Sequence, residues 1–229
     1  MIQFPIYLYD GDPIDQEGSY YVIAGNGIFL RKDNGSSVSL VPVDTISCLP
    51  DLKTTAFLKW KLPKIPKEIT FKVKQLFEEV YDLYKAEANV VLYYDFKNLQ
   101  WLVKVPSQKV KKRSVKYSLE PSPSSDLRRV ATIHSHGNSF AFHSPEDVKD
   151  EEYFDGLHCT FGDIKQKVFS ISASIVTNGY RENIDPLLVF DGIQESVSPS
   201  KITACKYVEL QEIPPKYNLD EWLKNIEGN

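Results

Sequence analysis

The run from Arg129 to His136 constrains the fold of this chain more than any other stretch. Its first five residues, up to Ile133, are rich in apolar and β-branched side chains, which is typical of a buried β-strand. His134 and His136 follow at once, and residues two apart in a strand point to the same face. The sequence therefore predicts two imidazoles side by side at the end of a buried strand.

A carboxylate follows the two histidines after a short loop. Seven residues separate His136 from Ser144, and Asp147 lies three positions further on. Two histidines, one aspartate and an open fourth position for water make a catalytic zinc site, whereas structural zinc sites are closed by four protein ligands. We therefore predict a Zn²⁺ ion held by His134, His136 and Asp147.

The same residues also have an ordinary structural interpretation. Ser144 is a good helix N-cap, Pro145 suits a first helical turn, and acidic residues such as Asp147 favour the positive end of the helix dipole. Taken singly, each residue favours this interpretation, because short motifs are weak signals. Four residue types at fixed spacing after a buried strand favour the metal site instead. Ser144 can serve both purposes, since a group at a helix N-terminus is held rigidly.

The complete spacing is His-Ser-His, seven residues, Ser, two residues and Asp, and it resembles the signature of the JAB/MPN-plus (JAMM) metalloproteases. Members of this family also have a catalytic glutamate where a helix gives way to a strand. Glu87 matches that position, because it follows a predicted helix and precedes a predicted strand that ends at Asp95. The resemblance covers about residues 67–193. Residues 25–29 and 155–158 are further similar to the protein A family of bacterial PRTRC-type systems.

The resemblance implies a fold, an activity and partners. The implied fold is α/β, with a JAB/MPN-type mixed sheet flanked by helices and a small β-rich N-terminal region. The implied enzyme is a zinc-dependent isopeptidase or peptidase that cleaves after the C-terminal glycine tail of a ubiquitin-like protein, in deconjugation or in precursor processing. Glu87 would be its general acid/base, and Ser144 would stabilise the oxyanion. Partners would be the ubiquitin-like protein or its conjugates, and E1/E2-like proteins of the same system.

Two alternative functions remain open. Some MPN-fold proteins lose catalysis and serve as scaffolds that bind a ubiquitin-like protein, and only Glu87 separates a metal-binding scaffold from an enzyme. A RadC-like factor associated with nucleic acid is suggested by the basic run Lys109–Arg113. A solvated hairpin is the better interpretation of this run, because the formal net charge of the whole chain is −4.

The amino-acid composition indicates in which cellular compartment the protein is expected. The three cysteines, Cys48, Cys159 and Cys205, are scattered and odd in number, which argues against a disulfide framework and for a reducing compartment. No apolar run approaches the roughly 20 residues that span a bilayer, and the N-terminus lacks the layout of a signal peptide. We expect a cytoplasmic protein that binds neither membrane nor nucleic acid. His143 is expected to be a surface loop residue, with a supporting role at the metal as the alternative, and His158 has no assigned role.

Periodicity predicts the order of the elements. A β-rich region over residues 1–62 precedes a JAB/MPN-like domain over residues 63–229, with proline-rich 62–66 as the boundary. Apolar residues at helical spacing predict a long helix over Lys67–Ala86. Shorter helices are predicted over 144–153 and 218–226. Strands are predicted over 20–24, 27–31, 38–42, 90–94, 101–105, 115–119, 130–134, 157–161, 168–177, 187–190 and 202–210.

Overall fold

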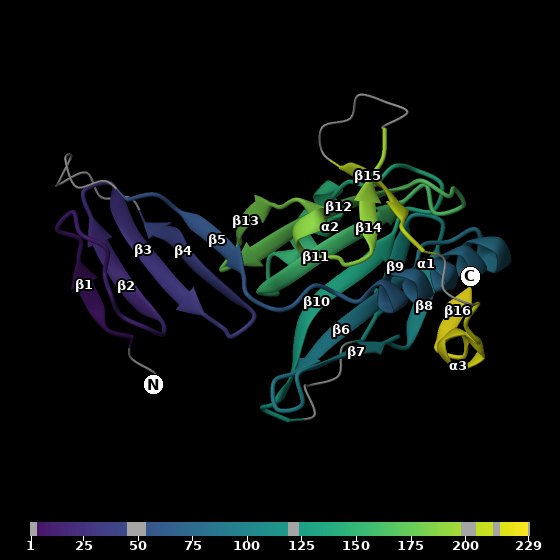
Figure 1. Ribbon diagram of the computed structural model, residues 1–229, viewed down its shortest axis with the longest axis horizontal. Helices are drawn as coiled ribbons and strands as arrows, with labels where there is room; N and C mark the ends of the chain where they lie inside the picture. The colour runs from purple at the N-terminus through teal and green to yellow at the C-terminus, as the bar shows by residue number, and fades with distance from the viewer. Residues whose placement is uncertain (1–3, 45–53, 119–123, 198–204, 213–215, 229) are drawn as a thin grey trace. The chain divides into compact units, whose positions relative to one another are not determined.

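The computed structural model describes residues 4–44, 54–118, 124–197, 205–212 and 216–228 (Figure 1). The chain divides into two compact units. The first contains Met1–Pro63 with Glu152–Gly156 and Ile175–Glu182. The second contains Lys64–Glu151, Leu157–Ser174 and Asn183–Asn229. Among the predicted features, Cys48, residue 119 and residues 202–204 lie outside the described residues.

The first unit contains a five-stranded sheet in the order β1-β2-β3-β4-β5. Its strands are β1 (Ile6–Leu8), β2 (Tyr20–Ala24), β3 (Gly27–Asp33), β4 (Ser37–Asp44) and β5 (Phe57–Trp60). The turn predicted at Asn34 joins β3 to β4, and the Asn34 side chain accepts hydrogen bonds from the backbone N–H groups of Ser36 and Ser37. The β-rich region is thus a sheet with two strands, β1 and β5, that the sequence pattern did not predict.

An eight-stranded sheet contributes most of its residues to the second unit and residues from Ile175–Glu182 to the first. The order is β14-β15-β12-β11-β10-β6-β7, and β13 pairs with β12. The strands are β6 (Asn89–Asp95), β7 (Gln100–Lys104), β10 (Leu127–Ser135), β11 (Gly156–Gly162), β12 (Phe169–Thr177), β13 (Tyr180–Asn183), β14 (Ile193–Glu195) and β15 (Lys206–Leu210). The central strand β10 lies antiparallel to β6 and parallel to β11. The histidine strand is therefore in the middle of the sheet, as its apolar sequence predicted.

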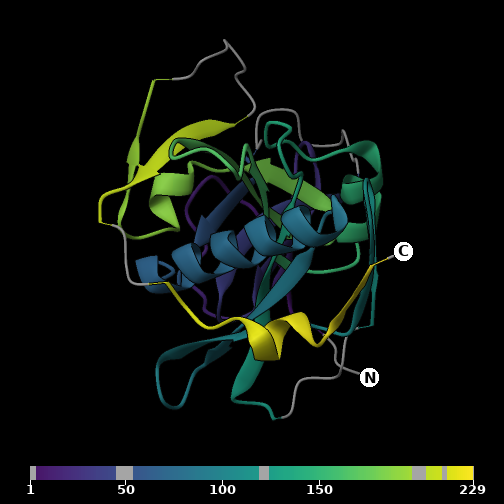
Figure 2. The ribbon, with the colours of Figure 1, turned by 90° about the vertical axis from the view of Figure 1, so that its right-hand side faces the viewer.

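The long helix α1 (Lys67–Tyr84) confirms the prediction from periodicity. Its buried face includes Val73, Leu76, Phe77 and Val80, which are spaced three or four residues apart. The Phe77 ring packs edge-on against Phe161 of β11, with 6.0 Å between centroids. Figure 2 shows α1 lying across the strands of this sheet. The helix ends at Lys85, whose backbone is left-handed.

The predicted α/β class is wrong, because this chain is mostly β. The described residues form sixteen strands in three sheets and three α-helices, and only α1 is long. The other two are α2 (Pro145–Glu151) and α3 (Asp220–Leu223). A sheet flanked by helices would need more long amphipathic helices than the chain provides.

Two segments differ from their predicted secondary structure. Of residues 187–190, predicted as a strand, the first two lie in a 3₁₀ turn, Pro186–Leu188, because the Asp185 side chain accepts from the Leu187 N–H and caps that turn. The predicted helix to Ile226 stops at Leu223. Ile226–Gly228 instead forms strand β16.

Strand β16 belongs to a small three-stranded sheet in the order β16-β8-β9. Strands β8 (Gln108–Lys111) and β9 (Ser114–Tyr117) form the hairpin predicted for the basic run, and β9 is the edge strand. None of the helices within the described ranges is both long and apolar enough to cross a bilayer.

Candidate metal centre

The two histidines of the predicted motif stand at the end of β10. His134 is the residue before the last of the strand, and the His136 N–H donates to the Phe161 carbonyl of β11 at 2.8 Å. Gly137 then turns the chain away with φ of 57°, and a Cβ there would lie 2.7 Å from the Tyr81 ring. Only glycine accommodates both the backbone angle and this close approach.

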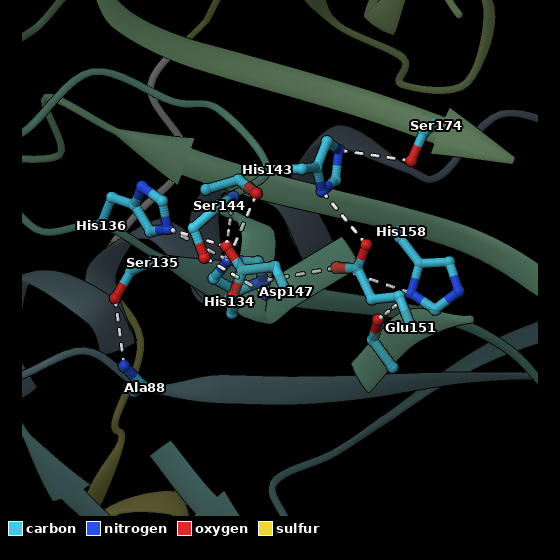
Figure 3. A network of polar contacts seen from close by, with 12 residues as sticks. Ala88, His134, Ser135, His136, His143, Ser144, Asp147, Glu151, His158 and Ser174 are labelled. Atoms are coloured by element: carbon cyan, nitrogen blue, oxygen red, sulfur yellow. Dashed lines mark hydrogen bonds and ion pairs between the residues drawn. The ribbon is translucent and has the colours of Figure 1, made fainter. Parts of the chain in front are cut away.

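The imidazoles and the Asp147 carboxylate meet at one point (Figure 3). The His134 Nε2 lies 3.3 Å from the His136 Nε2, and each nitrogen lies 3.4 Å from the Asp147 Oδ2. In a tetrahedral zinc site with bonds of about 2.0–2.1 Å, two ligand atoms lie about 3.3–3.4 Å apart. The three atoms therefore match one face of such a tetrahedron, and the group could hold a metal ion.

Helix α2 holds Asp147 through a reciprocal pair of hydrogen bonds. The Ser144 N–H donates to the Asp147 Oδ2 at 2.8 Å, and the Asp147 N–H donates to the Ser144 Oγ at 3.2 Å. This is the pattern of a capping box with aspartate in place of glutamate. A side-chain hydrogen bond from Ser144 is also among the interactions that lower the pKa of Asp147.

Electrostatics favour an ionised Asp147. Burial by itself would raise the pKa of this carboxyl, but hydrogen bonds from His134 and His136 more than offset it and hold the pKa far below its usual value. Burial likewise opposes a charge on His134, and the Asp147 carboxylate reverses that effect and raises its pKa. A divalent cation bound to these residues would balance the negative charge of Asp147, and the imidazoles would then not need to be protonated.

Glu87 lies in the connection between α1 and β6, and its backbone N–H donates to the Lys111 carbonyl at 3.1 Å. Its half-buried side chain lines a cavity of about 860 Å³, the site cavity, together with His134, His136, Ser144 and Asp147. All five residues selected from the sequence therefore border one space. Burial raises the pKa of Glu87 to about 7, although the positive charges of His134 and Arg113 oppose this.

Strand β9 and the loop after β10 complete the lining. All four residues of β9 border the site cavity. Phe142 also lines it, and its ring packs edge-on against His136 with 4.6 Å between centroids. Phe142 therefore both walls the site cavity and packs against a predicted ligand.

Three further residues surround this site: His143, for which a supporting role at the metal was only the alternative prediction, His158, which had no predicted role, and Glu151, which the sequence analysis did not single out. The expectation that His143 is a surface residue is wrong, because its side chain is only 6% exposed and its Nδ1 lies 3.2 Å from the Glu151 Oε2. Glu151 occupies the last turn of α2, four residues after Asp147, and that spacing alone indicates a shared helix face. Burial would raise the pKa of Glu151, but a hydrogen bond from His143 and the charges of the nearby histidines lower it to about 2.

The chain was compared with models of known protein families and with curated proteins. No model of a known protein family matches the chain, and no curated protein matches it significantly. A functional proposal for this chain therefore rests on the chemistry of its own residues.

Proposed function

We propose that this protein is a zinc-dependent peptidase or isopeptidase that cleaves after the glycine tail of a ubiquitin-like protein. The observation that carries the proposal is the position of Glu87, which shares one cavity with His134, His136 and Asp147. A metal-binding scaffold needs only the three ligand residues. A half-buried carboxyl with a pKa of about 7 beside them is what a general acid/base requires near neutral pH.

The donor set favours zinc over the common hard cations. Ca²⁺ and Mg²⁺ sites in proteins are built from oxygen ligands, whereas two imidazoles and one carboxylate suit Zn²⁺. The ligand-atom separations of 3.3 and 3.4 Å fit tetrahedral coordination. Two histidines and a carboxylate also bind Fe²⁺ in some oxygenases, so the metal content has to be measured.

The protein residues would divide the chemistry of hydrolysis between them. Zinc bound to this triad would lower the pKa of a water molecule toward about 7 and polarise the scissile carbonyl. Glu87 would remove the proton from the attacking water and return it to the leaving amine. The Ser144 hydroxyl would donate to the oxygen on which negative charge develops, the kind of contact worth about 2.7–4 kcal/mol.

The edge of β9 supports the choice of substrate. Among the strands that the structure describes, β9 pairs only with β8, and all its residues line the site cavity. An extended peptide can pair with such an edge as an added strand, which would lead its carbonyl toward Glu87 and the triad. Small residues before the scissile bond suit this approach, because glycine has no side chain to clash and tolerates unusual backbone angles.

The test is a cleavage assay with a ubiquitin-like protein from the same cell as substrate. Wild-type protein and Glu87→Gln are compared on a substrate with its natural terminal glycine and on one with leucine at that position. We expect wild-type cleavage of the glycine substrate only, and little cleavage by Glu87→Gln. Equal kcat/KM values for glycine and leucine substrates would reject recognition of the tail and point to a broader peptidase.

A further inference from the structure

All four histidines of this chain lie in one connected group. His134 and His136 face Asp147, whereas His143 and His158 face Glu151 (Figure 3). Glu151 is the residue that joins the two pairs. Its side chain is 9% exposed, which is unusual for a carboxylate.

The distances place one carboxylate among three imidazoles. The Glu151 Oε2 lies 3.2 Å from the His143 Nδ1. The Glu151 Oε1 lies 3.7 Å from the His158 Nδ1 and 3.9 Å from the His134 Nδ1. The two nitrogens of His134 therefore have different partners: Nε2 faces the ligand group, and Nδ1 faces Glu151.

The sheet register explains why His158 and His134 both reach Glu151. Strands β10 and β11 are parallel, with Thr132 beside His158 and His134 beside Thr160. Residues two apart share a face, so these four side chains project from the same side of the sheet. The Thr132 Oγ1 lies 2.9 Å from the His158 Nδ1, which anchors the ring.

His143 is anchored in the same way. Its Nε2 lies 3.3 Å from the Ser174 Oγ of β12, and its Nδ1 faces Glu151. Thus hydroxyl groups on β10 and β12 hold the outer two rings, and those rings hold the carboxylate. A buried carboxylate kept in this way is a fixed negative charge behind His134.

We propose that Glu151 is a positioning residue of the metal centre, which accepts the Nδ1 hydrogen of His134 and so presents the Nε2 lone pair to the metal. A histidine ligand generally donates its second nitrogen to a carboxylate or carbonyl, which fixes the tautomer and raises the basicity of the ligand. The 3.9 Å separation is an ion-pair contact, and a movement of about 1 Å brings it to hydrogen-bonding distance. This inference rests on the metal-binding part of the proposed function and is independent of the substrate.

The test compares Glu151→Gln with Asp150→Asn. Both remove one negative charge from α2 at adjacent positions and both side chains line the site cavity, but Asp150 is exposed. Zinc affinity is measured by competition with a chromogenic chelator, and the unfolding temperature is measured without and with zinc. We expect Glu151→Gln to bind zinc about 10–100-fold more weakly, as is typical for the loss of such a partner, while Asp150→Asn binds as the wild type does.

A purely structural role predicts a different pattern. It would lower the unfolding temperature of metal-free Glu151→Gln and leave its zinc affinity unchanged, which would overturn the proposal. An equal loss of zinc affinity in Asp150→Asn would also overturn the proposal. The loss would then come from removing any negative charge near the metal and not from the contact between Glu151 and His134.

A second variant keeps the proposal testable if Glu151→Gln does not fold. His143→Gln keeps Glu151 and loosens only its anchor, so we expect a smaller, few-fold loss of zinc affinity. Wild-type affinity in His143→Gln, together with an unfolded Glu151→Gln, would reject the proposal. A His134→Ala/His136→Ala variant that still binds zinc would instead reject the metal site itself, which separates the two failures.

Discussion

The Ser135 hydroxyl accepts a hydrogen bond from the backbone N–H of Ala88 at 3.1 Å, and the Ser135 N–H donates to the Ala88 carbonyl at 3.0 Å. Ser135 thus points away from its two histidine neighbours and fastens the residue next to Glu87 to the histidine strand. This pair of bonds ties the backbone next to Glu87 to the strand that carries His134 and His136. The serine between the histidines therefore has a structural task that the sequence motif alone did not reveal.

Ser135→Ala should separate catalysis from metal binding. The variant leaves the buried Ala88 N–H without its acceptor, a change that costs about 1–3 kcal/mol of stability. We expect kcat to fall while the zinc affinity stays near that of the wild type, because the three ligand residues are untouched. Ser135→Thr keeps the hydroxyl and is the control. A loss of zinc with unchanged kcat per bound zinc would contradict this role.

Glu87→Gln should stabilise the metal-free protein at neutral and higher pH. Burial raises the pKa of Glu87 from 4.5 to about 7 in the folded state. Between these two values the folded protein binds more protons than the unfolded chain, so stability falls as pH rises. Removing the ionisable group abolishes that cost, which is on the order of 1–3 kcal/mol. Thermal unfolding should show a gain at pH 8 and none at pH 4, and a gain at pH 4 would exclude ionisation as the cause.

The same substitution should lower cleavage by about 10²–10⁴-fold while zinc remains bound. Near-normal turnover by Glu87→Gln would move the general acid/base role to another residue. Glu120, the next candidate from the sequence, lies outside the described residues.

Arg113→Gln should shift the pH dependence of cleavage. Burial raises the pKa of Glu87, and the charge of Arg113 acts in the opposite direction. Loss of that charge raises the pKa further, so the acid limb of kcat/KM should move to higher pH by roughly 0.3–0.5 unit. Lys112→Gln, at the adjacent cavity-lining position, is the control and should leave the limb in place. A shift toward lower pH in Arg113→Gln would contradict the assignment.

Ser144 variants should separate its two roles. Ser144→Ala removes both the N-cap of α2 and the donor to the oxyanion, whereas Ser144→Gly costs the cap only a few tenths of a kcal/mol. We expect both variants to lose about 10²–10³-fold in kcat, with less destabilisation in Ser144→Gly. If kcat followed stability, so that Ser144→Gly retained most of its activity, the hydroxyl would act only as a cap.

The local pattern was sufficient for those parts of the fold that depend on one segment. Helix α1 was predictable because its apolar residues alone form a complete buried face. Strand β10 was predictable because its segment from Val130 to Ile133 is rich in β-branched residues and fully buried. The motif after it brought His134, His136 and Asp147 together because the spacing fixes a strand end and a helix start.

Other parts depend on contacts that no local pattern contains. The helical signal of residues 218–221 does give α3, but the helix ends at Leu223, and Ile226–Gly228 pairs instead with β8, more than a hundred positions earlier. The group around Glu151 depends on the register of β10 with β11, which brings His158 beside Thr132. The helix spacing of Asp147 and Glu151 was visible in the sequence, but the three imidazoles that meet Glu151 were not.

The metal content of the purified protein tests the central claim most directly. Elemental analysis of the wild type should give one zinc per chain, since His134, His136 and Asp147 provide three ligands for a single ion. The His134→Ala/His136→Ala variant should contain none, and Asp150→Asn should match the wild type. Undiminished zinc in the double variant, or iron in place of zinc in the wild type, would contradict the account.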